Sequence, residues 1–191
     1  MTVIGLCGAS GSGKTTACNY LAQKGYSILD CDAIYSEILY PGSPCLSSIR
    51  QAFGSQVIDD LGGLNRKELA RAVFSSNEKR ETLNRITFSF IKKEIFNRLQ
   101  RMDSDAKVIV DAPLLFESGL HSICDQTVGI LAPDSLKIQR LLERDKRTAQ
   151  ELTDRIRCQK TNDELVNLCD ETVVNDSDLS SFFGKLDHIF K

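Results

Sequence analysis

The feature that most restricts the fold of this chain is a glycine-rich segment near its N-terminus. Residues 8–15 read GASGSGKT and match the pattern GxxxxGK[ST] at every fixed position. Glycines let a backbone turn tightly enough to point successive N–H groups at phosphate oxygens. In this pattern Lys14 reaches the β- and γ-phosphates, and the Thr15 hydroxyl can bind Mg²⁺. The segment therefore predicts a binding site for a nucleoside triphosphate.

The residues on either side of this phosphate loop support the same prediction. The apolar run at 2–7 predicts a buried strand, and residues 14–24 have the composition of a helix that stops at Gly25. A strand, a glycine loop and a helix in this order place the positive end of the helix dipole at the phosphates. The strand and the helix on either side make a chance match the weaker alternative. A dinucleotide-binding loop is also weaker, because residues 11–16 do not fit GxGxxG. No NKxD sequence that would indicate guanine recognition is present.

The remaining strand signals predict an α/β fold with a parallel sheet. Short apolar runs predict strands at residues 2–7, 26–29, 107–110, 125–131 and 171–174. Alternation of such strands with helices is typical of a parallel sheet flanked by helices. We therefore expect a P-loop NTPase-type fold with a parallel five-stranded sheet.

Two helical stretches interrupt this pattern of strands. About 75 residues between the second and third strands carry no convincing strand, and Asn65 with Glu68 fits a capping box there. A shorter stretch follows the fourth strand, where Thr148 and Glu151 form a second cap signature. With 191 residues and about 150 per domain, we expect one domain.

Composition narrows the classes of partner. The 24 basic and 26 acidic residues give a net charge of −2, which offers no electrostatic reason to expect nucleic acid or an anionic membrane surface. No apolar run approaches the roughly 18 residues of a membrane span. The N-terminus does not fit a signal peptide. The seven cysteines are scattered without a CxxC pair, and the two histidines lack ligand spacing. We therefore expect a cytoplasmic protein with reduced thiols and no structural zinc site.

Candidate acidic groups follow the second and third predicted strands. Asp30 and Asp32 come directly after the second strand, and Asp111 ends the third. Ligands bind at the carboxyl ends of strands in such sheets, so Asp32 can accept a proton from an attacking hydroxyl or help to hold Mg²⁺. The alternative for Asp32 is helix capping. For Asp111, metal organisation and turn formation before Pro113 are both open.

Three arginines form a second candidate group. Arg140, Arg144 and Arg147 have the spacing i, i+4, i+7 and would share one helix face. Guanidinium groups bind phosphate oxygens in pairs and stabilise charge during phosphoryl transfer. The alternative is a solvated helix face that pairs with nearby acidic residues.

Several separated blocks together resemble the dephospho-coenzyme A kinase family. The blocks are IGLCGASGSGKTT at 4–16, DCDAI at 30–34, LNRKEL at 64–69, VF at 73–74, PLLFE at 113–117, QRLLERD at 139–145 and RIxxQ at 155–159. Any protein with a phosphate loop could supply the first block. The combination in this order covers most of the chain and is specific.

The resemblance implies a role for each matching residue. ATP would be held by Gly8, Gly11, Ser12, Gly13, Lys14, Thr15 and Thr16. The catalytic residues would be Asp32 as the base for the ribose 3′-hydroxyl of dephospho-CoA, Lys14, and Arg144 as the lid arginine. The acceptor would be bound by Asp32, Arg66, Leu115 and Glu117. Thr15 would bind Mg²⁺.

The resemblance also implies a division of the single domain 1–191. The nucleotide-binding core would comprise residues 1–32, 105–132 and 168–191. A helical insertion at 33–104 would help to bind the acceptor, and a helical lid would occupy 133–167. Cys7 stands where the family usually has threonine, Ala9 and Ser10 replace Gly-Ile, and Phe88 with Ser89 replaces His-Pro. None of these departures removes a predicted phosphate-transfer residue.

The sequence thus predicts an Mg²⁺-dependent kinase that uses ATP and dephospho-CoA and that has neither nucleic-acid nor membrane partners. We expect a monomer, with a small homo-oligomer as the alternative. Two other functions stay open at this point. One is a P-loop kinase that acts on a nucleoside or a nucleoside monophosphate. The other is a nucleotide-dependent switch without an acceptor substrate.

Overall fold

The computed structural model describes residues 1–74 and 76–190. Its centre is a five-stranded sheet with the strand order β2-β3-β1-β4-β5. Neighbouring strands run parallel in the pairs β1–β3, β1–β4 and β4–β5. The expected parallel five-stranded sheet is confirmed. By backbone contacts the chain divides into two compact units, Met1–Leu29 with Asp103–Lys191, and Asp30–Met102.

The first unit contains the sheet and the helices that cover it. Its strands are β1 Thr2–Cys7, β2 Ser27–Asp30, whose last residue belongs to the second unit, β3 Lys107–Asp111, β4 Gln126–Leu131 and β5 Glu171–Val174. Its helices are α1 Lys14–Gln23, η2 Leu120–Ile123, α6 Asp134–Arg144, α7 Ala149–Arg157, α8 Asn162–Leu168 and α9 Leu179–Ile189. The expected strands agree with these bounds to within one residue.

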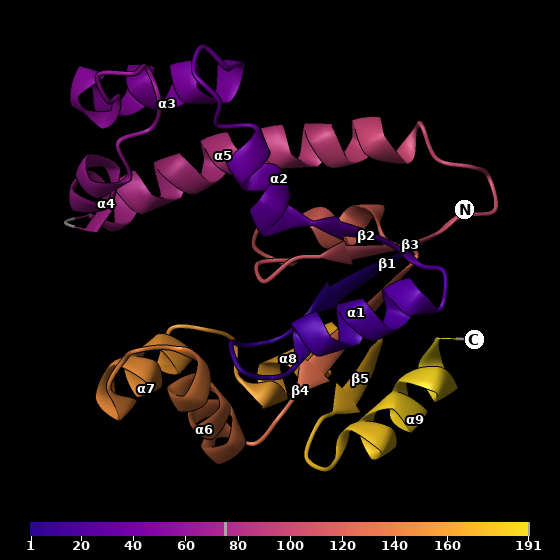
Figure 1. Cartoon of the computed structure of the whole chain (residues 1–191). Helices are drawn as coiled ribbons and strands as arrows, with labels where there is room; N and C mark the ends of the chain where they lie inside the picture. Colours follow the sequence, from indigo (N-terminus) through magenta and orange to yellow (C-terminus); the bar gives the residue numbers. More distant parts are fainter. Residues whose placement is uncertain (75, 191) are drawn as a thin grey trace. The chain divides into compact units, whose positions relative to one another are not determined.

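The alternation of residues along β1 assigns the helices to the two faces of the sheet. Ile4 and Leu6 belong to the main apolar cluster, which also contains Leu21 of α1 and Phe182 of α9. α1 and α9 lie side by side on this face (Figure 1). Gly5 points to the opposite face, since successive side chains of a strand alternate. That face is covered by the segment after β3 and by α8.

The second unit is built from helices: α2 Cys31–Glu37, α3 Pro44–Phe53, η1 Ser55–Val57, α4 Arg66–Phe74 and α5 Asn77–Leu99. It has its own apolar cluster, in which Leu46 and Ile49 of α3, Val57 of η1 and Leu69 of α4 are buried. Apart from Asp30, which ends β2, and an isolated bridge between Ile58 and Leu64, the described part of this unit has no strand. The helical character predicted for this stretch agrees with the structure.

Several helix boundaries follow the local signals in the sequence. Gly25 adopts φ +90° just beyond α1 and closes its last turn through a hydrogen bond to the Ala22 carbonyl. Thr148 and Glu151 form the expected capping box at the start of α7. Among the helices in residues 1–74 and 76–190, none has the length and apolar character of a membrane span.

Candidate functional site

The phosphate loop connects β1 to α1 and relies on two glycines with positive φ. Gly11 and Gly13 have φ values of +81° and +103°, a backbone region that other residues rarely adopt. A side chain at Gly11 would also lie 2.7 Å from the Lys137 carbonyl oxygen of α6. Both the backbone shape and the packing therefore require glycine at this position.

One buried hydroxyl in the loop has no hydrogen-bond partner. Ser12 is 1% exposed, and within the described residues its Oγ is without a donor or acceptor. The Ser12 carbonyl, by contrast, accepts a hydrogen bond of 2.8 Å from Asn175 Nδ2. A buried polar atom without a partner is costly, so a hydroxyl left in this state in a phosphate loop is the kind of group that a bound ligand would satisfy.

The charged groups of the site lie where the loop meets α1. Lys14 forms an ion pair with Asp111 at the end of β3, and both side chains are largely buried. α1 begins after Gly13, which has no side chain to cap the helix, so the first N–H groups stay available for an anion. Thr15, in the first turn, is exposed and Thr16 is half-buried. Asp111 is the last residue of β3, and its carboxylate bonds to Lys14.

Oxygen donors suited to Mg²⁺ lie in this region. The Thr15 hydroxyl and the Asp111 carboxylate are hard oxygen ligands, and Mg²⁺ commonly binds through one or two such groups together with substrate phosphates. The residues present therefore fit a phosphate-bound Mg²⁺. In the described part of the chain, no three His, Cys, Asp or Glu side chains come together in a way that could hold a metal ion.

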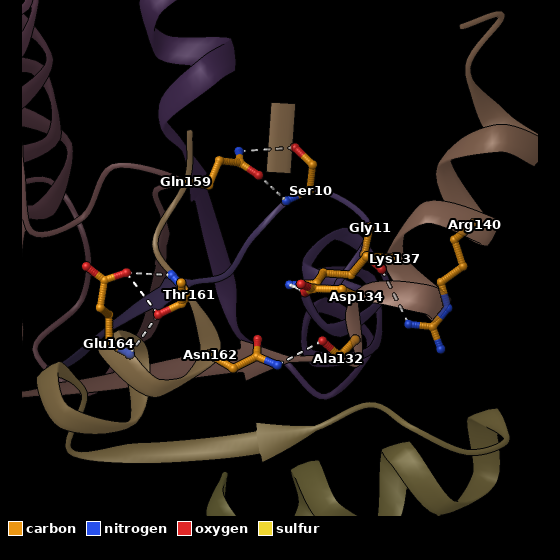
Figure 2. Close-up of polar contacts among 10 residues, drawn as sticks. All are labelled: Ser10, Gly11, Ala132, Asp134, Lys137, Arg140, Gln159, Thr161, Asn162 and Glu164. Carbon is orange, nitrogen blue, oxygen red and sulfur yellow. Dashed lines mark hydrogen bonds and ion pairs between the residues drawn. The ribbon is translucent and has the colours of Figure 1, made fainter. Parts of the chain in front are cut away.

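Arg140 of α6 contacts the outer side of the loop. Its Nη1 donates to the Gly11 carbonyl over 3.4 Å, and its Nη2 donates to the carbonyl and side-chain oxygens of Asn175, each over 3.3 Å. Figure 2 shows Arg140 turned toward Gly11. Asn175 follows β5 and in turn binds Ser12, so these two side chains connect three segments around the loop.

Gln159 contacts the loop from the end of α7. Its Oε1 accepts a hydrogen bond of 2.9 Å from the Ser10 backbone N–H, and its Nε2 donates to the Ser10 hydroxyl over 3.2 Å (Figure 2). One amide side chain thus bonds to both the backbone N–H and the hydroxyl of a loop residue.

Arg144 makes different contacts from those of Arg140. It donates two hydrogen bonds to Asp145, of 2.7 and 3.1 Å, and Arg155 lies 3.3 Å from the same carboxylate. The hydrogen bonds from Arg144, together with the Arg155 charge, hold the pKa of Asp145 below its usual range. The expected face of three arginines is wrong for Arg147, because α6 ends at Arg144 and Asp145 is extended.

The segment 113–117 differs from expectation at one residue. Leu115 is fully buried, and its side chain packs so tightly on β1 that a Cβ at Gly5 would lie 2.9 Å from it. Glu117 is exposed and lies 3.0 Å from Lys160. A small cavity of about 50 Å³ separates this segment from the start of the loop and from residues 158–160.

The remaining predicted residues belong to the second unit. Asp30 caps α2 by accepting hydrogen bonds of 2.8 and 3.1 Å from the backbone N–H groups of Asp32 and Ala33. Helix capping by Asp32 is therefore wrong, and Asp32 stands exposed in the first turn. Arg66 begins α4, where its charge opposes the rise that burial causes in the pKa of Tyr35.

Sequence reasoning missed the contacts of Gln159 and Asn175 with the loop. Gln159 was part of a block typical of the family, but no role followed from that pattern. Asn175 directly follows β5, at the carboxyl edge of the sheet, where ligands bind in parallel sheets. That position was the only signal that could have found it.

Comparisons with known proteins agree on one family. The model of the dephospho-CoA kinase family matches residues 2–181. A dephospho-CoA kinase from Fusobacterium nucleatum is 34% identical over 185 residues, which cover 97% of this chain and 95% of the relative. The chain belongs to the dephospho-CoA kinase family. The members of this family are ATP-dependent kinases, so the expected enzyme class is confirmed, and a switch without an acceptor is not favoured.

Solved structures support the fold of this dephospho-CoA kinase family member. The protein TT1252 from Thermus thermophilus is 26% identical with a TM-score of 0.83, over 98% of this chain and 95% of that chain. A dephospho-CoA kinase from Campylobacter jejuni has a TM-score of 0.72 over 98% and 94% of the two chains. Its identity is 23%, so this likeness concerns the fold alone.

Proposed function

We propose that this chain transfers the γ-phosphate of ATP to the ribose 3′-hydroxyl of dephospho-CoA, giving CoA and ADP, the last step of coenzyme A synthesis. The observation that carries the proposal is the match to a single kinase family across residues 2–181, with every fixed position of the phosphate loop retained. We further propose that the protein works in the cytoplasm as a monomer, with no nucleic-acid or membrane partner.

In this proposal the loop and the start of α1 bind ATP. The N–H groups of the loop and of the first turn of α1 would surround the β- and γ-phosphates, and the Ser12 hydroxyl would gain a partner there. Lys14 is paired with Asp111 beside the loop. On ATP binding its ammonium group would turn in part from the Asp111 carboxylate to the phosphate oxygens. The residues assigned to ATP are Gly8, Gly11, Ser12, Gly13, Lys14, Thr15 and Thr16.

The Thr15 hydroxyl, with the Asp111 carboxylate directly or through water, would hold Mg²⁺ beside the phosphates. When bound, Mg²⁺ neutralises charge on the phosphate oxygens that would otherwise repel an incoming oxygen. The release of Asp111 from Lys14 on ATP binding would make its carboxylate available for this role.

The transfer itself needs a base and positive charge. In the proposed step the 3′-hydroxyl oxygen forms a bond to the γ-phosphorus while the bond to the β–γ bridging oxygen breaks, and ADP leaves. Asp32 takes the proton of the hydroxyl. Lys14 offsets charge on the transferred group. Arg144 does the same after its hydrogen bonds to Asp145 have been released.

The acceptor site would include Asp32, Arg66 and Glu117. Arg66 offers a guanidinium for an anionic group of dephospho-CoA, and Glu117 is an exposed acceptor of hydrogen bonds beside the small cavity near the loop. We leave Leu115 out of the site, because its fully buried side chain has no surface to offer. The proposed division of the domain is unchanged. It comprises a core at 1–32, 105–132 and 168–191, an acceptor insertion at 33–104 and a lid at 133–167.

A product assay tests the proposal. The protein is incubated with Mg²⁺, ATP and dephospho-CoA, and the products are separated and weighed by mass spectrometry. We expect ADP and an acceptor that has gained one phosphoryl group at the 3′ position. Lys14→Met should abolish this product. ADP without phosphorylated acceptor would contradict the proposal.

A related assay tests the remaining alternative, a kinase that acts on a nucleoside or a nucleoside monophosphate. ADP release is compared across dephospho-CoA, AMP, CMP, uridine and shikimate at equal concentrations. Dephospho-CoA should give the highest kcat/KM by several orders of magnitude. A higher value for any of the other acceptors would assign the chain a different substrate.

A further inference from the structure

The contact between Gln159 and Ser10 joins residues 149 positions apart in the sequence. The two hydrogen bonds, of 2.9 and 3.2 Å, use both ends of the Gln159 amide (Figure 2). The bond from the Ser10 N–H fixes the orientation of the amide, because a flip would place the Gln159 Nε2 donors against this N–H donor. The contact is therefore directional.

Gln159 is itself held in place by its surroundings. It follows Cys158, the residue that caps α7, and its backbone N–H donates to the Ile156 carbonyl over 2.9 Å. The next residue, Lys160, lies 3.0 Å from Glu117. The amide thus projects from a short turn that is anchored on both sides, which keeps it near the loop.

The loop benefits from outside support at this point. Ser10 precedes Gly11, where the backbone has positive φ, and glycine-rich segments lose much conformational freedom when they become ordered. Gln159 restrains Ser10, Arg140 restrains the Gly11 carbonyl and Asn175 restrains the Ser12 carbonyl. Three consecutive loop residues are therefore held by side chains from three other segments.

We propose that Gln159 is a positioning residue that holds the phosphate loop in the shape that binds ATP. It acts through Ser10 and does not touch the reacting atoms. A loop that is ordered before ATP arrives avoids the entropy cost of ordering upon binding. The inference rests on the proposed function only in assigning ATP as the ligand of the loop.

The variants isolate this role step by step. Gln159→Met removes both hydrogen bonds at similar side-chain size, and Ser10→Ala removes only the bond to the hydroxyl. Gln150→Met is the matched control, because Gln150 is an exposed amide on α7 whose side chain, within residues 1–74 and 76–190, bonds to Asp154 of the same helix. Circular dichroism establishes that each variant is folded before it is measured.

ATP affinity is measured directly by calorimetry with Mg-ATP and without an acceptor. We expect the Kd to rise about tenfold in Gln159→Met, equivalent to about 1.4 kcal/mol, and about threefold in Ser10→Ala. Gln150→Met should match the wild type. In the double variant, Ser10→Ala should add nothing to Gln159→Met, because the hydroxyl has already lost its partner.

Steady-state assays distinguish positioning from a general loss of structure. KM for ATP should rise in Gln159→Met, while kcat and KM for dephospho-CoA stay within about twofold of the wild type. An unchanged ATP Kd in Gln159→Met, or an equal loss in Gln150→Met, would overturn the inference. If Gln159→Met does not fold, Ser10→Ala decides, and a wild-type Kd there overturns it.

The two proposals fail in different ways. A wild-type protein that binds ATP but makes no phosphorylated dephospho-CoA defeats the proposed function. The calorimetric comparison of Gln159→Met with the wild type still tests the positioning role in that case.

Discussion

Asp30 and Asp32 stand two residues apart at the start of α2 and have different surroundings. Asp30 accepts two backbone hydrogen bonds as the cap of the helix, whereas Asp32 is an exposed residue in the first turn. The sequence left both roles open for this pair of carboxylates. The cap geometry now separates them and leaves Asp32 as the residue proposed for proton transfer.

This separation gives a paired test. Asp32→Asn should lower kcat by about 10²- to 10⁴-fold, the usual contribution of a general base, while the Kd for ATP changes little. Asp30→Asn should keep near wild-type turnover, because asparagine caps helices about as well as aspartate. Turnover and calorimetric ATP binding are measured on both. Wild-type turnover in Asp32→Asn would remove it from the base role.

A second residue-scale effect concerns thiol ionisation. Burial raises the pKa of Cys45 to about 11, above the value of about 8.5 for an exposed thiol. Because the folded state disfavours the thiolate, the stabilisation is fully present below about pH 8.5 and is lost as the pH rises toward about 11.

The stability of Cys45→Ala relative to the wild type should report this loss. Its deficit in free energy of unfolding should be largest near pH 8 and should shrink by about pH 10.5, because only the wild type loses the thiol contribution. Urea denaturation at the two pH values measures it. A deficit that does not depend on pH would show that Cys45 contributes through packing alone.

At the scale of elements, α3 depends on a buried cap. The Ser43 hydroxyl is fully buried and accepts a hydrogen bond of 3.1 Å from the Leu46 N–H, and Pro44 occupies the first helical position. This combination of serine and proline is a strong start signal. It anchors α3 within the apolar cluster of the second unit.

Loss of this cap should therefore destabilise the protein. Ser43→Ala is expected to lower the free energy of unfolding by about 1–2 kcal/mol, measured by urea denaturation. Gln51→Ala, an exposed change on the same helix, should stay within about 0.5 kcal/mol of the wild type. Equal effects of the two changes would argue against capping as the cause.

The boundaries of α6 and α7 show what local sequence could and could not predict. The capping box at Thr148 was evident, and it implied that the preceding helix must stop before that residue. The end of α6 at Arg144 carries no glycine or proline signal, so the i, i+4, i+7 spacing of the arginines predicts a helix that continues to Arg147, about one turn beyond its actual end. Residue spacing predicts which side chains share a helix face only as far as the helix continues.

At the scale of the whole molecule, the sequence predicts the phosphate loop and the five strands because the residues that identify each of them are adjacent in the chain. The loop pattern needs eight adjacent residues, and each strand is a short apolar run. The bonds from Gln159 and Asn175 to the loop join residues about 150 or more positions apart. No local pattern pairs such residues, because their meeting depends on the sheet order and on the packing of helices against it.

Ligand binding should stabilise the folded chain as a whole. Mg-ATP at about 100 times its Kd adds about 2.7 kcal/mol, which corresponds to a rise of roughly 5–10 °C in the Tm of a protein of this size. Lys14→Met should abolish most of the rise, and a chelator of divalent cations should reduce it in the wild type. Differential scanning calorimetry measures each. A rise that is the same with and without the chelator would contradict the proposed Mg²⁺ role.

The position of β1 in the centre of the sheet has a consequence for synthesis on the ribosome. β1 leaves the ribosome before the other four strands, yet Thr2 pairs with Lys107 of β3 and Ile4 with Gln126 of β4. The segment Asp30–Met102, with its own apolar cluster, emerges in between. β1 therefore stays unpaired until that helical unit has emerged, and the phosphate loop gains its contacts with Gln159 and Asn175 only after the segments that carry these two residues have also emerged.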